Sequence, residues 1–290
     1  MSSGDNLKTY RGNCHCGAFI YEARLPEITS YSECNCSICR KKGYAWLFAS
    51  EGQLDIVKGS IDELASYTFN NGIFVHRFCS TCGTGVLAQN IKDPSAVTTA
   101  INGLDVWSLD IKPFDGKELP PAYKPASYQG PEPAAKFDGG KTYNGSCHCG
   151  AVTLAVKVDK PLEARDITVD EERIVECNCS ICSRGAYIWI YPLVEETVIE
   201  GREHLDYRAF NKTVVRKAFC RHCGVHICNE LNELTDAEIE ALNDAAKAWR
   251  DRSKSIRPIT LRVLDDFDFK TLKTNRLDGW NIIKPLYVNP

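Results

Sequence analysis

The sequence predicts a mainly β protein built from two tandem copies of one cysteine-rich module, with few helices. Three observations support this fold class. Of the 15 cysteines, 14 fall into two copies of one ordered pattern. The segments between the cysteine groups are short runs rich in Val, Ile, Phe, Tyr and Trp, separated by glycine-containing turns, which is typical of strands. No βαβ alternation occurs, so we expect mainly antiparallel sheets.

Each copy contains three cysteine groups in the same order. These are a Cys-x-Cys pair followed by Gly-Ala, a Cys-Asn-Cys-Ser-Ile-Cys group, and a Phe-Cys-x-x-Cys-Gly knuckle. They occupy residues 14–18, 34–39 and 78–83 in the first copy, and residues 147–151, 177–182 and 219–224 in the second. Cys228 is the single cysteine outside the pattern.

Residues 113–140 separate the copies and contain six of the 13 prolines. Such a stretch continues neither a helix nor a central strand, so it is expected to be a surface linker. We therefore predict a first module over residues 1–112, a linker over residues 113–140 and a second module over residues 141–290. The second module also carries an extra segment after Asn229.

Apolar and β-branched runs predict strands at residues 18–23, 45–49, 73–78, 152–158, 187–191 and 214–219. One helix is predicted in the extra segment, where Thr235 and Glu238 form a capping box. The apolar stripe of this helix would consist of Ile239, Leu242, Ala246 and Trp249.

The composition narrows the class of protein. Hydrophobic residues make up 43% and charged residues 25%, both ordinary for a globular protein. No apolar run approaches the ~20 residues that span a bilayer, and the polar stretch from Met1 to Tyr10 lacks the core of a signal peptide. We therefore expect a cytoplasmic protein without a membrane partner. There, closely spaced cysteines are more often metal ligands than disulfides.

The outer cysteine groups of each copy predict a closed zinc site. Zinc prefers tetrahedral coordination by thiolates, and structural sites usually draw ligand pairs from two turns. A Cys-x-Cys pair and a distant knuckle together supply four sulfurs. We therefore assign one site to Cys14, Cys16, Cys79 and Cys82, and its twin to Cys147, Cys149, Cys220 and Cys223.

The middle group of each copy offers three sulfurs and has no matching fourth cysteine. The first trio is Cys34, Cys36 and Cys39, and the second trio is Cys177, Cys179 and Cys182. Three protein ligands plus an open position is the arrangement of catalytic zinc, although pairing of a middle group with a knuckle remains an alternative. An open zinc–thiolate site holds a bound thiol as thiolate and polarises a carbonyl oxygen. Chemistry that joins a thiol to a small aldehyde fits both capacities.

This scheme places up to four zinc ions in the chain. The four-thiolate sites would each add −2 and the trios −1, so the formal charge of −3 becomes about −9. Such a charge gives no bulk attraction for phosphate backbones, so nucleic acid is not an expected partner.

The three cysteine groups and their flanking glycines resemble the family of glutathione-dependent formaldehyde-activating enzymes and centromere protein V. The resemblance covers nearly the whole chain, twice, as in a tandem member. It implies a zinc-pinned antiparallel β-tent fold, with four-cysteine sites that are structural and with Cys34, Cys36 and Cys39 catalytic. It also implies a carbon–sulfur lyase activity that forms S-(hydroxymethyl)glutathione from glutathione and formaldehyde, with glutathione sulfur at the open position of the trio.

A basic run follows each trio and differs between the copies. The first copy continues with Arg40-Lys41-Lys42 before a glycine, whereas the second continues with Ser183-Arg184 before a glycine, one residue shorter. These cations either attract the carboxylates of glutathione or, as is more usual for charge runs, face solvent. Together with about ten more residues before Cys177, over residues 161–175, the shorter run puts the shape of the second pocket in doubt. We therefore expect zinc in both copies and favour activity in the first.

The remaining residues near the cysteine groups have ordinary structural interpretations. His15 and His148 lie inside Cys-x-Cys pairs and are expected to point outward. Cys228 is expected to be a buried core cysteine rather than a fourth ligand of the second trio. Trp46 and Trp189 follow the trios in equivalent strands, where they either wall a substrate pocket or pack in the core. Three further histidines are expected to be ordinary strand or loop residues: His76, His222 and His226.

The sequence therefore favours an enzyme that joins a thiol, with glutathione the first candidate, to an aldehyde such as formaldehyde. The alternative is a non-catalytic, zinc-stabilised binding or scaffold protein. A long basic or disordered tail would favour that alternative, and a lost trio cysteine would favour a decayed scaffold. The chain has neither feature.

Overall fold

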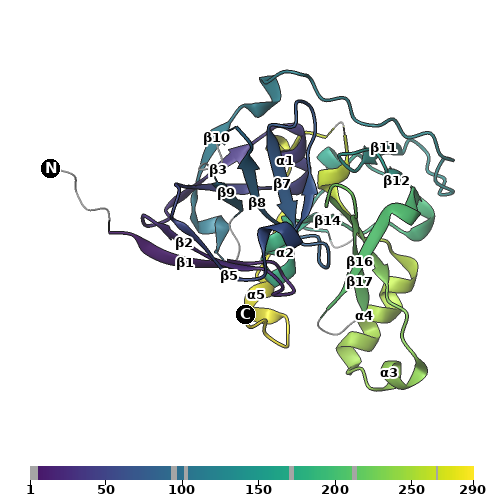
Figure 1. Ribbon diagram of the computed structural model, residues 1–290. Coiled ribbons are helices and arrows are strands. Elements are labelled where there is room, and N and C mark those ends of the chain that lie inside the picture. The colour runs from purple at the N-terminus through teal and green to yellow at the C-terminus, as the bar shows by residue number, and fades with distance from the viewer. Residues whose placement is uncertain (1–5, 93–96, 101–103, 170–172, 211–213, 266) are drawn as a thin grey trace.

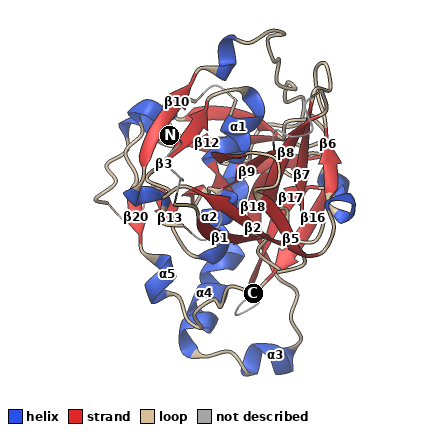
Figure 2. Cartoon of the chain, turned by 60° about the vertical axis from the view of Figure 1, so that its left-hand side comes forward, coloured by secondary structure: helices blue, strands red, loops and turns tan. Residues whose placement is uncertain are grey.

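A computed structural model describes residues 6–92, 97–100, 104–169, 173–210, 214–265 and 267–290. The protein is mainly β, as predicted, and each copy of the repeat forms one three-stranded and one seven-stranded sheet (Figures 1 and 2). Within the described part of the chain, no helix is long and apolar enough to cross a bilayer.

In the first module the strand orders are β1-β2-β5 in the small sheet and β10-β3-β4-β9-β8-β7-β6 in the large one. The strands are β1 (Lys8–Asn13), β2 (Ile20–Leu25), β3 (Ser30–Cys34), β4 (Ala45–Ala49), β5 (Leu54–Lys58), β6 (Ala65–Tyr67), β7 (Phe74–Phe78), β8 (Gly85–Asn90), β9 (Val97–Ala100) and β10 (Asp110–Phe114).

The second module repeats this arrangement, with orders β11-β12-β15 and β16-β17-β18-β19-β14-β13-β20. The strands are β11 (Lys141–Ser146), β12 (Thr153–Val158), β13 (Val175–Cys177), β14 (Ile188–Ile190), β15 (Thr197–Glu200), β16 (Leu205–Ala209), β17 (Val215–Cys220), β18 (His226–Leu231), β19 (Ile259–Thr260) and β20 (Asn275–Leu277). All six strands predicted from the sequence are present, with ends that differ by at most two residues.

The described strands pair antiparallel except at one equivalent place in each large sheet. There, β10 runs parallel to β3, and β20 runs parallel to β13. Both β3 and β13 end at the first cysteine of a trio. Strand β10 crosses the predicted module boundary at residue 112, so the start of the predicted linker is part of a sheet. The rest of that segment arches over the top of the molecule in Figure 1.

The single helix predicted in the second module is wrong in its extent, because two helices occupy the segment: α3 (Asp236–Glu240) and α4 (Asp244–Ser255). The predicted capping box of Thr235 and Glu238 is present. The break arises because Asn243 caps a new helix, accepting a hydrogen bond from the Ala246 N–H at 2.9 Å. Two short helices not predicted from the sequence follow the second cysteine of each trio: α1 (Ser37–Lys42) and α2 (Ser180–Gly185). A third, α5 (Gly279–Ile282), lies near the C-terminus.

The two modules pack against each other and share the largest of three apolar clusters that the described residues form. The largest buried cluster combines Ile38, Tyr44 and Trp46 of the first module with second-module residues such as Ile227 and Leu261. The glycine of each knuckle packs against the phenylalanine of the other knuckle. A Cβ on Gly224 would lie 2.7 Å from the Phe78 ring, and one on Gly83 would lie 2.7 Å from the Phe219 ring. Glycine is therefore required at both knuckles for the modules to approach this closely.

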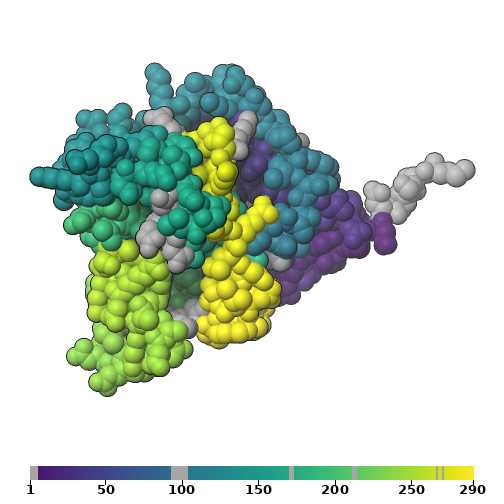
Figure 3. Space-filling model, turned by 180° about the vertical axis from the view of Figure 1, so that it is seen from behind, coloured from purple at the N-terminus to yellow at the C-terminus, as the bar shows by residue number. Residues whose placement is uncertain are grey.

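Each module also sends its C-terminal tail across the four-cysteine site of the other. The Tyr123 hydroxyl donates to the His148 carbonyl at 2.9 Å, and the Tyr287 hydroxyl donates to the His15 carbonyl at 2.8 Å. Figure 3 shows the C-terminal residues beside the first module. Each module therefore supplies a hydrogen bond to the backbone of the other module's four-cysteine site.

Candidate functional site

The structure brings the outer cysteines of each copy together in four-sulfur clusters. In each cluster all four Sγ atoms lie within 4.8 Å of one another. The Cys14 and Cys16 sulfurs are 3.6 Å apart, and the Cys147 and Cys149 sulfurs 3.5 Å. A tetrahedral zinc ion with Zn–S bonds of about 2.3 Å separates its sulfurs by about 3.8 Å, so both donor sets fit zinc. The clusters are Cys14, Cys16, Cys79 and Cys82, and Cys147, Cys149, Cys220 and Cys223.

Backbone donors support these sulfurs in the same way in both modules. The Phe19 N–H donates to Cys14 Sγ, and the Val152 N–H donates to Cys147 Sγ, both at 3.3 Å. Such hydrogen bonds stabilise thiolates, which are the form of cysteine that binds a metal. Each cluster ties the first strands of its module to the β7–β8 or β17–β18 hairpin.

The middle cysteines form two separate three-sulfur clusters, the first trio and the second trio. Cys34 ends β3, and Cys36 and Cys39 lie at the start of α1 and in its first turn. Within the described ranges, no fourth His, Cys, Asp or Glu donor atom joins either trio. Three sulfurs suit a zinc ion with one position left for another ligand.

Each trio already stabilises one thiolate. Hydrogen bonds from the Cys36 and Cys39 thiols lower the pKa of Cys34 to about 3. Hydrogen bonds from Cys177 and Cys182 lower the pKa of Cys179 to about 2. The Trp46 indole N–H also donates to Cys39 Sγ at 3.2 Å. The tryptophan therefore contacts the sulfur cluster itself as well as the core.

Two glycines beside the trios were missed by the sequence reasoning. A Cβ on Gly116 would lie 2.5 Å from Cys34 Sγ, and one on Gly279 would lie 2.5 Å from Cys177 Sγ. Any other residue would collide with the sulfur. Each glycine follows an aspartate, in Phe-Asp-Gly after β10 and Leu-Asp-Gly after β20, and this recurring tripeptide was the available signal.

The asparagine inside each Cys-Asn-Cys holds the Asp-Gly turn over its trio. The Asn35 amide donates to Asp115 Oδ1 at 2.7 Å, and the Asn178 amide donates to Asp278 Oδ1 at 3.1 Å. The same asparagines accept backbone hydrogen bonds from residues 117 and 280. The parallel strands thus deliver a backbone turn to one side of each trio.

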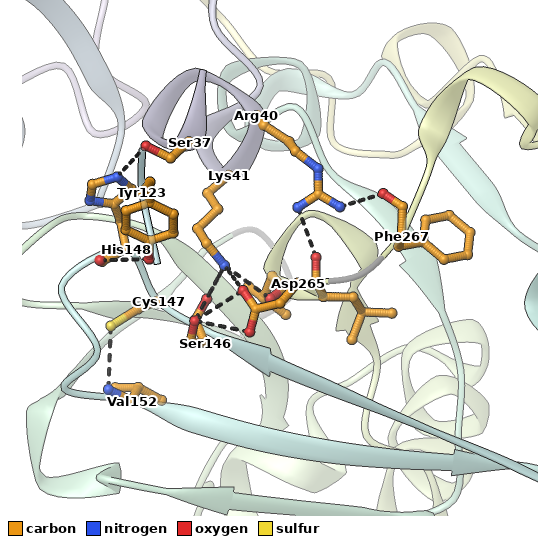
Figure 4. A network of polar contacts seen from close by, with 12 residues as sticks. Ser37, Arg40, Lys41, Tyr123, Ser146, Cys147, His148, Val152, Asp265 and Phe267 are labelled. Carbon is orange, nitrogen blue, oxygen red and sulfur yellow. Dashed lines mark hydrogen bonds and ion pairs between the residues drawn. The ribbon is translucent and has the colours of Figure 1, made fainter. Parts of the chain in front are cut away.

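The interpretation of the basic run as solvent-facing is wrong, because both lysines are buried. Figure 4 shows Lys41 directed at Asp265 and Ser146 of the second module. Lys41 and Lys42 are 3% and 5% exposed. Lys41 Nζ lies 2.6 Å from Asp265 Oδ1 and donates to the Ser146 carbonyl at 2.8 Å. Lys42 donates to the Gly224 carbonyl at 2.9 Å. These cations bind the second module, so they are not available to the carboxylates of a substrate.

The corresponding cation of the second copy does the same in reverse. Arg184 is buried and donates to the Asn13 carbonyl at 3.0 Å, directly before the first four-sulfur cluster. Although the second copy has one residue fewer before its glycine, both helices have six residues. The left-handed position that ends them is Gly43 in the first copy and Ala186, rather than Gly185, in the second.

The prediction that the histidines of the Cys-x-Cys pairs point outward is also wrong. His15 and His148 are 5% and 4% exposed and lie between the modules. His148 Nε2 is 2.9 Å from Ser37 Oγ, and His15 Nε2 is 3.2 Å from Ser180 Oγ. Burial lowers the pKa of both histidines to about 4, so they are neutral at pH 7.

The aromatic residues beside the two trios, Tyr44 in the first module and Tyr187 in the second, have different polar neighbours. Burial lowers the pKa of His76 to about 3, and its neutral ring stacks on Tyr44 with centroids 5.8 Å apart. At the equivalent position, two residues before the knuckle phenylalanine, the second module has Lys217. Its Nζ lies 4.2 Å from the Trp189 ring centroid and 4.8 Å from that of Tyr187. The second trio therefore has a buried cation beside it.

Cys228 lies outside the sulfur clusters, and an inter-module cavity adjoins the second trio. Cys228 is fully buried in β18 and belongs to neither sulfur cluster of its module. The cavity, of about 230 Å³, reaches Cys177 and Cys182 and is also lined by Tyr44 of the first module and by Arg262. Both modules therefore contribute to the space beside this trio.

These features agree with a comparison against protein families. The family described as "Glutathione-dependent formaldehyde-activating enzyme" matches residues 9–115 and 142–258, one match in each module. The chain belongs to this family. Both regions contain all seven cysteines of their copy, so the duplicated clusters are those of two glutathione-dependent formaldehyde-activating enzyme modules. Residues 259–290, which supply β19, β20 and α5, lie beyond the second match.

Individual similar proteins are more distant. A Halomonas elongata protein named "Putative glutathione-dependent formaldehyde-activating enzyme" is 27% identical over 101 residues, which span 32% of this chain and 64% of that protein. A crystal structure of a Rhodobacter sphaeroides protein aligns over its whole length and 36% of this chain, with 28% identity and a TM-score of 0.31.

Proposed function

We propose that this chain joins a thiol, most simply glutathione, to formaldehyde or a related small aldehyde, at trios that each hold one zinc ion. The observation that carries the proposal is the contrast within each module. Four sulfurs close one cluster, whereas three sulfurs form the other with no fourth described donor. Zinc bound at a trio would supply a position at which a substrate sulfur is held as thiolate or a carbonyl oxygen is polarised.

The reaction is an addition without a redox step. One bond forms between the thiol sulfur and the aldehyde carbon, the carbon–oxygen double bond becomes single, and the thiol proton ends on the new hydroxyl. The protein's part is to hold the three sulfurs at fixed separation and to limit water around the reacting atoms. Positioning of this kind lowers the entropic part of the barrier.

Specific residues of the chain would perform these tasks. The backbone N–H of Cys36 donates to Cys34 Sγ at 3.4 Å, and Trp46 donates to Cys39 Sγ. These donors disperse charge on the ligand sulfurs. Tyr44 is 5% exposed, and its ring centroid lies 4.3 Å from that of Trp46. The two rings form an apolar wall beside the trio. The corresponding wall of the second trio is Tyr187 and Trp189.

The proposal makes two measurements decisive. The purified chain should contain four zinc ions, two in the closed clusters and two in the trios. Exchange between formaldehyde and S-(hydroxymethyl)glutathione, followed by NMR, should exceed the spontaneous rate. The variant Cys36→Ser/Cys179→Ser should abolish that excess while the unfolding midpoint stays close to that of the parent chain. Cys228→Ala serves as a control, because it removes a buried sulfur outside both clusters.

The single variants decide which module is active. The longer insertion before Cys177 favours the first module, so Cys36→Ser is expected to remove more of the activity than Cys179→Ser. An exchange rate equal to the spontaneous one, tested across several thiols and aldehydes, would contradict the proposed function.

A further inference from the structure

The helices that carry the trio cysteines both begin without a capping side chain. Helix α1, which carries Cys39, has Cys36 at its N-cap and receives no hydrogen bond from a capping side chain. Helix α2 has Cys179 at its N-cap and is uncapped in the same way. A short helix with an uncapped start gives its first turn little internal support. Ligands in that turn need support from elsewhere.

That support comes from the other module. The first residue of α1 is Ser37, whose hydroxyl lies 2.9 Å from His148 Nε2. The first residue of α2 is Ser180, whose hydroxyl lies 3.2 Å from His15 Nε2. Each serine directly follows a trio cysteine, and each histidine lies between two cysteines of the opposite module's closed cluster. The contacts are reciprocal.

His148 is itself held tightly by the module that it supports. Its Nδ1 is 2.7 Å from the Tyr67 hydroxyl, and its ring stacks on Tyr123 with centroids 4.4 Å apart. The Phe69 ring packs against it in a T-shaped arrangement, with ring centroids 4.5 Å apart. Both ring nitrogens therefore have partners in the first module, which fixes the orientation of the imidazole.

His15 makes a weaker version of the same contact. It stacks on Tyr287 at 4.9 Å, but its buried Nδ1 has no hydrogen-bond partner among the described residues. The chain thus contains a strong and a weak example of one arrangement.

The far ends of the trio helices are also fixed by the opposite module. Lys41 and Lys42 at the end of α1 donate to second-module carbonyls, and Arg184 near the end of α2 donates to the Asn13 carbonyl. We propose that His148 is a positioning residue for the first trio and His15 for the second, so that each metal centre is completed by the other module. The inference rests on the metal-binding part of the proposed function and goes beyond it.

Cobalt(II) titration of the full-length chain tests this, because thiolate-to-cobalt absorption reports on sulfur ligation without any assay of turnover. The chain carrying Cys179→Ser has a complete first trio and an incomplete second one. In that background, His148→Ala is expected to weaken cobalt binding at the first trio about tenfold, at the low end for loss of a residue that supports a ligand. The spectrum of the two closed clusters should stay unchanged.

Matched variants separate positioning from general damage. His148→Gln places an amide where Nε2 reaches Ser37 and should recover most of the affinity. Ser37→Ala removes the contact with a smaller change in the core, and should weaken the first trio even if His148→Ala fails to fold. In the reciprocal background, with Cys36→Ser, His15→Ala should weaken the second trio less than His148→Ala weakens the first.

The outcomes discriminate clearly. Unchanged cobalt affinity in both His148→Ala and Ser37→Ala overturns the inference alone. Loss of cobalt from the cluster of Cys147 and Cys149 instead of the first trio also overturns it, because His148 would then act on its own turn. An unmodified chain that binds two cobalt ions rather than four contradicts the proposed function and the inference together.

Discussion

Replacing Lys41 by methionine removes the cation of an ion pair buried between the modules. The side chains of Lys41 and Asp265 are 2% and 7% exposed. Burial lowers the pKa of Lys41 and raises that of Asp265, so for both groups the loss of hydration outweighs their attraction. Lys41→Met leaves the carboxylate with the Ser146 hydroxyl, at 3.1 Å, as a remaining donor.

The expected magnitude follows from this imbalance. Removing one partner of a buried pair typically lowers the free energy of unfolding by about 3–5 kcal/mol, because a charge is left without compensation. Removing both partners in Lys41→Met/Asp265→Leu should cost less, about 1–2 kcal/mol. That remainder reflects the carbonyls of Ser146 and Val263, which lose the lysine as a donor.

Urea unfolding of the zinc-loaded protein, followed by tryptophan fluorescence, measures both values. The control is Lys254→Met, which breaks a pair of similar length, 2.7 Å, between side chains 60% and 71% exposed. We expect no measurable change there, since water screens the pair. A Lys41→Met variant as stable as this control, or a double variant less stable than the single one, would refute the reasoning.

Three further predictions concern other residues. Burial holds the pKa of His76 and of His226 near 3, below the value of about 6.5 in an unfolded chain, so unfolding takes up protons and stability falls as the pH drops between these values. His76→Gln should reduce the slope of unfolding free energy against pH by about one proton, and an unchanged slope would argue against this. Lys217 adds to the hydrogen bonds from Cys177 and Cys182 that lower the pKa of Cys179. Lys217→Met should therefore raise the pH at which iodoacetamide alkylation of the metal-free second trio reaches half its maximal rate, while an unchanged midpoint would exclude the effect. Ala186 has φ of +47°, a backbone conformation that favours glycine. Ala186→Gly should therefore stabilise the chain by about 1 kcal/mol in urea unfolding. Gly43→Ala should instead destabilise the chain, because the new Cβ would collide with the Ala186 Cβ.

The local features of this protein could be predicted from its sequence. Strands are visible because β-branched and aromatic residues recur between turns, and β4 occupies the predicted residues 45–49. The grouping of Cys14 with a distant knuckle follows from the demand of zinc for four soft donors supplied in pairs. Duplication made these patterns easier to recognise, because each group appears twice in the same order.

The surroundings of the trios could not be predicted in this way. Lys41 and Ser146 are 105 residues apart in sequence, and nothing near Lys41 indicates whether its ammonium meets water or a buried carboxylate. The same holds for His148, which looks like a spacer between two ligands but contacts Ser37 across the interface. Charge runs usually lie at the surface, and here the packing of two modules placed one inside.

By itself, the sequence determined the elements that depend on spacing along the chain: the duplication, the grouping of the cysteines and the mainly antiparallel strands. Only the tertiary structure decided which groups face each other across the interface, including Gly116 against Cys34 and His148 against Ser37. The physical reason is that ligand spacing and strand periodicity act over a few residues. Burial and hydrogen bonding between modules depend instead on how two complete surfaces fit together.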